Sequence, residues 1–162
     1  MPMPFHMTLT ATKQGAIAIQ CCTMTGREDT ILCQALNHEV YIPRDIQTGS
    51  ATGKRVHNAL TVTKVFDRAS PLLYQALTTS DHMTDVTLKF YQISKSGIEE
   101  HYFTIKLEDA IIVSIKPWIP NTLDPARDGF THMEDVSFTY SKIIWTHMTT
   151  GVEAQDSWEV PK

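Results

Sequence analysis

Alternation between apolar and polar residues constrains the fold of this chain more than any other feature of its sequence. In the segments 5–10, 60–66, 86–91 and 136–140, the apolar residues occupy alternate positions, which is the period of a β-strand with one buried face. The segment 36–42 follows the same period, with a histidine as a polar break. About seven such strands predict a mainly β fold, either an antiparallel β-barrel or a tight β-sandwich.

One long strand is expected to change direction partway along its length. The alternation of residues 103–107 resumes over residues 111–115, with the odd-numbered positions apolar in both. Glu108 and Asp109 interrupt it, which indicates a bulge or a sharp corner. The preceding Ser94–Gly97 segment has the residue types of a hairpin connection.

A single segment has the spacing of a helix. Ser70 can cap the free amides at a helix start, and Pro71 suits the first helical position, where no amide hydrogen is needed. The apolar residues with helical spacing are Leu73, Ala76 and Leu77. We expect one short helix over about residues 70–79, with its apolar side docked on the barrel because so short a helix is marginal alone.

Two segments lack any alternation. Residues 43–58 are polar and rich in glycine and proline, which predicts a long extended loop. Residues 117–129 contain three prolines and predict a second surface excursion. With no linker or repeat between them, residues 1–162 are expected to form a single domain.

Composition and charge argue against several classes of function. The formal net charge is −4 and the basic residues are scattered, so nucleic acid is not expected as a partner. No apolar run reaches the roughly 20 residues of a membrane-spanning helix, and no signal peptide is visible. Cys21, Cys22 and Cys33 are an odd number of thiols and are expected to stay reduced, as in a cytoplasmic protein.

No motif indicates an enzyme, a metal site or a cofactor. The seven histidines have neither His-x-His nor His-Glu-x-x-His spacing. The paired acids Glu99–Glu100 diverge on a strand, whereas a glycosidase pair must converge. Gly49–Arg55 resembles a phosphate loop only superficially, because Arg55 stands where magnesium needs a hydroxyl and a strand follows. We therefore expect no catalytic residue and no cofactor.

Several segments, taken in order, resemble one known family over nearly the whole chain. They are Met1–Pro4, Gly53–His57, Ser70–Leu77, Val86–Tyr91, Glu100–Phe103, Asp124–Pro125, Phe130–Thr131 and Val136–His147. The ordered set resembles the Hcp (haemolysin-coregulated protein) family, whose members form the inner tube of the bacterial type VI secretion system, and its spacing is most like the enterobacterial branch. The family motif in this chain comprises Ser70, Pro71, Leu72, Leu73 and Tyr74.

The resemblance implies a structural protein rather than an enzyme. Six subunits would form a ring, and rings would stack into a hollow tube inside a contractile sheath. The implied partners are further copies of the chain, the sheath, spike and baseplate proteins, and small effectors carried in the lumen. Assembly in the cytoplasm would be followed by secretion through the type VI machine, without a signal peptide and without membrane insertion. The chain is expected to carry no C-terminal toxin extension.

Under this interpretation, residues of the long loop reach a neighbouring subunit or the next ring. These residues are Gly49, Ser50, Thr52, Gly53, Lys54, Arg55 and His57. The hydroxyl residues opposite the apolar strand faces are candidates for the lumen, namely Thr61, Thr63, Ser137 and Thr139. The alternative is a monomeric β-barrel that binds a small ligand in an apolar interior cavity.

Overall fold

The computed structural model describes residues 3–158, and about half of this part of the chain is β-strand. The longer strands are β1 (Phe5–Ala11), β3 (Ile31–Asn37), β6 (Leu60–Val65), β7 (Met83–Ile93), β8 (Glu99–Trp118), β9 (Met133–Thr139), β10 (Lys142–His147) and β11 (Val152–Ser157). The short strands are β2 (Gly15–Ala16), β4 (Val40–Tyr41) and β5 (Val56–His57). The helical elements are α1 (Ser70–Thr78) and the 3₁₀ turn η1 (Pro125–Arg127).

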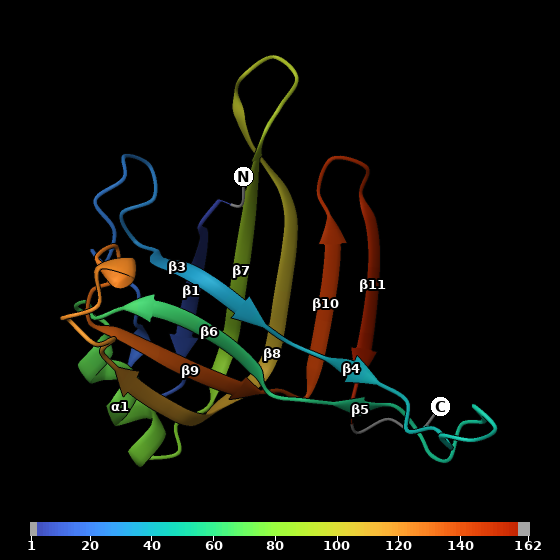
Figure 1. The fold of residues 1–162 in the computed structure, drawn as a ribbon. Helices are drawn as coiled ribbons and strands as arrows, with labels where there is room; N and C mark the ends of the chain where they lie inside the picture. The colour runs from blue at the N-terminus through green and yellow to red at the C-terminus, as the bar shows by residue number, and fades with distance from the viewer. Residues whose placement is uncertain (1–2, 159–162) are drawn as a thin grey trace.

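Six strands close into an antiparallel barrel (Figure 1), in the order β8, β7, β1, β3, β6, β9 and back to β8. Strand β8 closes the barrel because it is 20 residues long and pairs on the same side with two neighbours. Its first part pairs with β10 and its second part with β9. Strands β10 and β11 thus extend the sheet beyond the barrel. The prediction of a mainly β barrel with one short helix is confirmed.

The expected corner of the long strand lies at Asp109, whose φ of +50° is unusual for a residue other than glycine. Before it Leu107 is buried, and after it Ala110 and Ile112 are buried, so the inward-facing positions change from odd to even. The prediction that the odd positions from 111 to 115 all face the core is therefore wrong, and Val113 is 44% exposed. A register shift against β9 follows Ile112 and changes the alternation again.

Apolar side chains fill the inside of the barrel. They come from all six barrel strands and from α1, and the fully buried ones include Met7, Ile31, Leu60, Leu73, Leu88, Leu107 and Phe138. The alternation predicted the buried faces of 5–10, 86–91 and 136–140, and the burial of Phe5, Val86 and Val136 confirms it. Burial of such side chains supplies most of the driving force for folding.

Two predicted strand segments end earlier than their alternation indicates. The segment 36–42 leaves the barrel after Asn37, and its later apolar residues Val40 and Ile42 are exposed. The segment 60–66 ends at Val65, and Phe66 is exposed because the chain turns there toward α1. In both cases the apolar residues follow the strand pattern, but they lie beyond the end of the strand in the barrel sheet.

Helix α1 begins with a different contact from the one predicted. Its N-cap is Ala69, so Ser70 lies inside the first turn and does not cap the helix. The carboxylate of Asp67 accepts a hydrogen bond from the amide of Ala69 at 2.9 Å, and no side chain forms a cap hydrogen bond at this end of the helix. The hydroxyl of Ser70 donates to Glu134 on β9 at 2.7 Å. Pro71 lies in the first turn, at the second helical position and not at the first as predicted, and Leu73 and Ala76 are buried.

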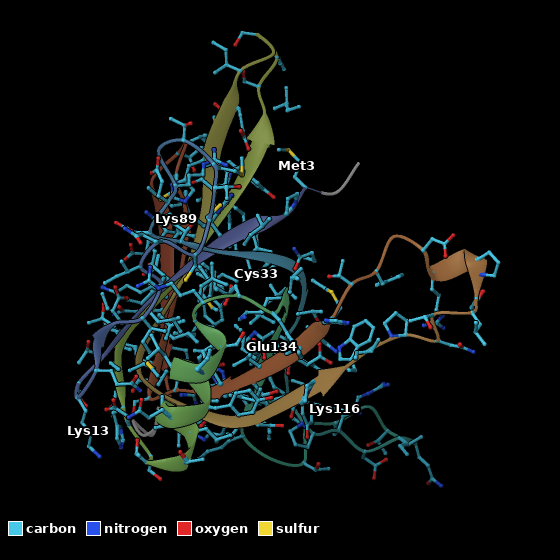
Figure 2. All side chains as sticks on the ribbon, turned by 90° about the vertical axis from the view of Figure 1, so that its left-hand side faces the viewer. Met3, Lys13, Cys33, Lys89, Lys116 and Glu134 are labelled. Carbon is cyan, nitrogen blue, oxygen red and sulfur yellow. The ribbon has the colours of Figure 1, made fainter. Side chains whose placement is uncertain are left out.

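Three segments project from the barrel. The first, which we call the arm, runs from residue 38 to residue 58 and contains the β4–β5 pair; it extends beyond the barrel at the lower right of Figure 1. The second is the β7–β8 hairpin, turned by Ser94–Gly97 as predicted, where Gly97 has a φ of +81°. The third segment, residues 119–132, connects β8 to β9. It lies between Lys116 and Glu134, which Figure 2 labels, and the figure shows it standing away from the barrel.

Candidate assembly surface: the arm and its anchor

The tip of the arm is open to solvent. Gly49, Ser50, Thr52, Gly53 and Lys54 are all exposed. The turn is ordered by its own backbone and by one carboxylate. The carboxylate of Asp45 accepts hydrogen bonds from the amides of Gln47 and Thr48, at 2.8 and 2.9 Å. These bonds lower the pKa of the Asp45 carboxyl. The exposed tip is available for contact with another molecule, which the loop prediction requires.

The base of the arm is bound to the end of β11. The guanidinium of Arg55 forms a salt bridge through Nε with Asp156, and its Nη2 donates to the carbonyl of Ser157 at 2.9 Å. His57 is only 3% exposed, and its Nε2 lies 2.7 Å from the same carboxylate oxygen of Asp156. Because His57 is enclosed within its own subunit, its side chain is not available to a neighbour, in contrast to the exposed residues of the tip.

Three side chains link the arm to the barrel in one hydrogen-bonded row. The hydroxyl of Tyr140 lies 2.7 Å from Nδ1 of His57 and 2.8 Å from Nε2 of His38. Tyr140 follows β9, whereas His38 and His57 come from the two ends of the arm. The indole of Trp158 lies over this row, with its ring centre 5.5 Å from that of His57 and 6.0 Å from that of Tyr140.

The charges of the row follow from its surroundings. The hydrogen bond from Arg55, followed by the one from His57, lowers the pKa of Asp156 to about 2, although partial burial acts in the opposite direction. Burial raises the pKa of the Tyr140 hydroxyl, and the nearby Asp156 charge adds to this effect. Burial also lowers the pKa of His38. At neutral pH, Asp156 is therefore ionised and Tyr140 is a neutral hydroxyl.

The predicted lumen residues lie together on the outer face of β6 and β9. Thr61 is bonded to Ser137 at 2.8 Å, and Thr63 donates to Asp135 at 2.7 Å. Thr139 continues the same face and lies opposite Ile111 of β8. All four hydroxyl residues are half-buried. Asp135 also accepts a hydrogen bond from the indole of Trp118 at 3.2 Å, so this face carries a carboxylate as well as hydroxyls.

The residues of the family motif, in contrast, serve helix docking. Ser70 and Leu73 are buried, Leu72 is partly buried against the core, and Tyr74 is exposed on the far side of α1. Lys64 of β6 lies below the helix start and is 0% exposed. It forms a salt bridge with Glu134, which is 1% exposed, and bonds Ser70 at 3.2 Å.

Sequence reasoning missed the residues that hold the arm in place. Asp156 and Tyr140 lie about a hundred positions from their partners in the arm, and no local spacing connects them. The one available signal is His38, which interrupts an otherwise apolar alternation and contacts Tyr140 in the structure.

Among the described residues, no group of three or more His, Cys, Asp or Glu side chains could hold a metal ion. The three cysteines are free. Within residues 3–158, no helix is long and apolar enough to cross a membrane.

The fold therefore defines a closed, side-chain-filled antiparallel barrel with one docked helix and a projecting β-arm. The family model described as "Type VI secretion system effector, Hcp" matches residues 21–147. The "Major exported protein" of Pseudomonas aeruginosa is 48% identical over 99% of this chain and 98% of its own length.

Solved structures agree with this family match. A structure described as an Hcp protein covers 98% of this chain and 99% of its own with a TM-score of 0.91 and 33% identity. The secreted protein Hcp3 of Pseudomonas aeruginosa covers 97% of this chain and 99% of its own, with a TM-score of 0.81 and 42% identity. The chain belongs to the Hcp family of the type VI secretion system, a family of secreted structural proteins and not of enzymes. Its placement in the enterobacterial branch stays a prediction.

Proposed function

We propose that this chain assembles into six-membered rings that stack into the hollow inner tube of a type VI secretion system. The tube is expelled by contraction of the surrounding sheath, together with the spike and with small effectors held in its lumen. Membership of the Hcp family supports this function, and the observation that carries it is the family match over most of the chain.

The surface of the subunit supports self-assembly. A closed ring of identical subunits needs two different surfaces that fit each other. Exposed apolar side chains gather on the three projecting segments: Ile42 and Ile46 on the arm, Ile93 and Ile98 on the β7–β8 hairpin, and Ile119, Leu123 and Phe130 on residues 119–132. Exposed apolar groups in such numbers are typical of surfaces that become buried against a partner.

The same subunit also carries an apolar surface apart from the tips of the projecting segments. A groove of about 330 Å³ is lined by Leu36, Phe90, Tyr102, Phe103 and Ile105, and its walls are largely apolar. The projecting segments of one subunit and this groove on the next are the kind of unlike surfaces that form a head-to-tail contact. The outer face of β6 and β9, with Thr61 and Ser137, is the surface we assign to the lumen.

The alternative function, a monomeric barrel that binds a small ligand inside, is less well supported. Such a barrel needs an enclosed cavity with a few polar groups. Here the barrel interior is occupied by buried side chains, including Met7, Leu60 and Phe138.

Light scattering coupled to size-exclusion chromatography tests the proposal. We expect a mass of about six times the 18.3 kDa of the chain, stable on dilution, because a closed ring satisfies every interface. A mass that stays at 18.3 kDa over a wide range of concentration would refute the ring and favour the monomeric alternative.

A further inference from the structure

We propose that Asp156 is a latch that positions the arm for assembly, by holding Arg55 and His57 against the end of β11. The inference rests on the proposed function, because the arm matters here as the element that contacts another subunit. It assigns a role to residues of β11 and of the loop after β9, which are not part of the arm.

The arm needs an anchor because its own structure is weak. Strands β4 and β5 are two residues long each and pair only with each other, in a sheet separate from the barrel. A two-stranded ribbon is at best marginally stable in water. Near the tip, one further bridge joins Arg44 and Ala51. The tip side chain Ile46 is 94% exposed and contributes no packing within the subunit.

Side-chain contacts at the base of the arm supply the missing attachment. Arg55 reaches Asp156 and the carbonyl of Ser157, His57 reaches Asp156 and Tyr140, and His38 reaches Tyr140. The contacts to His38 hold the β4 side of the ribbon, and the contacts to Arg55 and His57 hold the β5 side. Asp156 is the member of this set that binds two arm residues at once.

The direction of each hydrogen bond follows from the charge of Asp156. An ionised carboxylate only accepts, so Nε2 of His57 must carry its proton. In neutral His57, Nδ1 then accepts from the hydroxyl of Tyr140. The oxygen of Tyr140 in turn accepts from Nε2 of His38. With this arrangement each donor in the row faces one acceptor.

Arg55 adds a geometric constraint that a lysine could not reproduce. Its guanidinium uses Nε on the carboxylate and Nη2 on the backbone carbonyl of Ser157, which is 2.9 Å away. Two donors in one rigid plane fix the direction of the arm as well as its attachment. The arm therefore leaves the barrel in one direction, which a ring contact with fixed geometry requires.

The first measurement reports directly whether residues 38–58, the arm, are attached to the barrel. Limited trypsin digestion of the full chain, followed by mass spectrometry, reports cleavage after Arg44 and Lys54, which lie in the arm. We expect cleavage of Asp156→Asn to be at least about tenfold faster than in the wild type, because loss of the anchor favours local opening. Asp156→Glu keeps the carboxylate and should recover most of the protection. Glu153→Gln makes the same charge change on an exposed residue of β11 and should behave as the wild type.

The second measurement follows assembly of the same variants by light scattering. The melting temperature of the barrel serves as a check on folding. Faster cleavage of Asp156→Asn, loss of its ring mass and an unchanged barrel melting temperature support the latch. An unchanged rate of cleavage overturns it, and so does faster cleavage with an intact ring. If the wild type itself is monomeric, the proposed function fails, and the cleavage rates alone decide whether Asp156 holds the arm.

Discussion

Among single residues, Asp156 makes the attachment of the arm sensitive to strong acid. Its carboxyl has a pKa of about 2 in the folded protein, lowered mainly by Arg55 and then by His57. A group with a lowered folded-state pKa stabilises the protein above its unfolded pKa, near 3.9, and this contribution is lost as the pH falls toward the folded value. We expect tryptophan fluorescence to change between about pH 4 and pH 2, because Trp158 packs on His57 beside Asp156. Asp156→Asn should lack this acid transition, and an equal transition in the variant and the wild type would contradict the assignment.

At the same scale, the sequence could predict which residues face the core but not which polar residues join them. Alternation places Leu60 and Val62 inward, and both are buried. Lys64 has the same parity and is also buried, but its partner Glu134 is 70 positions away in the sequence. His57 appeared to be a loop residue available for contact, and its enclosure depends on Tyr140 and Asp156 of distant elements. Pairing across the barrel is information that no local pattern carries.

Among the elements, helix α1 is attached to the barrel by charge as well as by apolar packing. Lys64 binds Glu134, Asp67 and Ser70 just below the helix start. Removing one partner of a buried ion pair leaves the other without compensation, which costs about 3–5 kcal/mol. We therefore expect Lys64→Met to lower the free energy of unfolding by about 3–5 kcal/mol, measured by urea denaturation. The double variant Lys64→Met with Glu134→Leu should recover most of this loss, and a double variant as unstable as the single one would show that the charges themselves are not the cause.

The elements also show where the sequence stops being informative. Helix α1 was predicted to within one residue of its end, because Pro71 and the spacing of Leu73 and Ala76 are local signals. The corner at Asp109 was predicted from a broken alternation, but the strand faces beyond it were not, because the positive φ of Asp109 changes their parity and the register shift after Ile112 changes it again. Strand β11 had no signal, since most of its residues are exposed and it pairs only with β10.

For the whole molecule, the net charge bears on the stacking of the proposed rings. In the proposed assembly, six subunits of −4 each would carry a formal charge of about −24, and two such rings would repel each other. At about 0.15 M salt this repulsion is screened beyond about 8 Å, which leaves contacts at the ring faces to decide whether stacking occurs. Lys54 at the tip of the arm is exposed and positively charged, and it can meet an acidic group of the next ring. Arg55 is not free for this role, because it binds Asp156 within its own subunit.

This difference between neighbouring residues gives a test of stacking that leaves the arm anchored. Lys54→Glu and Lys13→Glu change the ring charge equally, and both residues are exposed, but Lys13 lies in the turn between β1 and β2, outside the three projecting segments. If only the total charge governs stacking, the two variants should assemble tubes and be exported alike. If the arm tip joins consecutive rings, Lys54→Glu should keep the ring mass and lose export by a cell with an active type VI system, whereas Lys13→Glu should be exported nearly normally. Light scattering measures the ring, and the amount of protein in the culture medium measures export. Equal export of the two variants would remove the arm tip from the contact between rings, and the inter-ring surface would then have to lie elsewhere on the subunit.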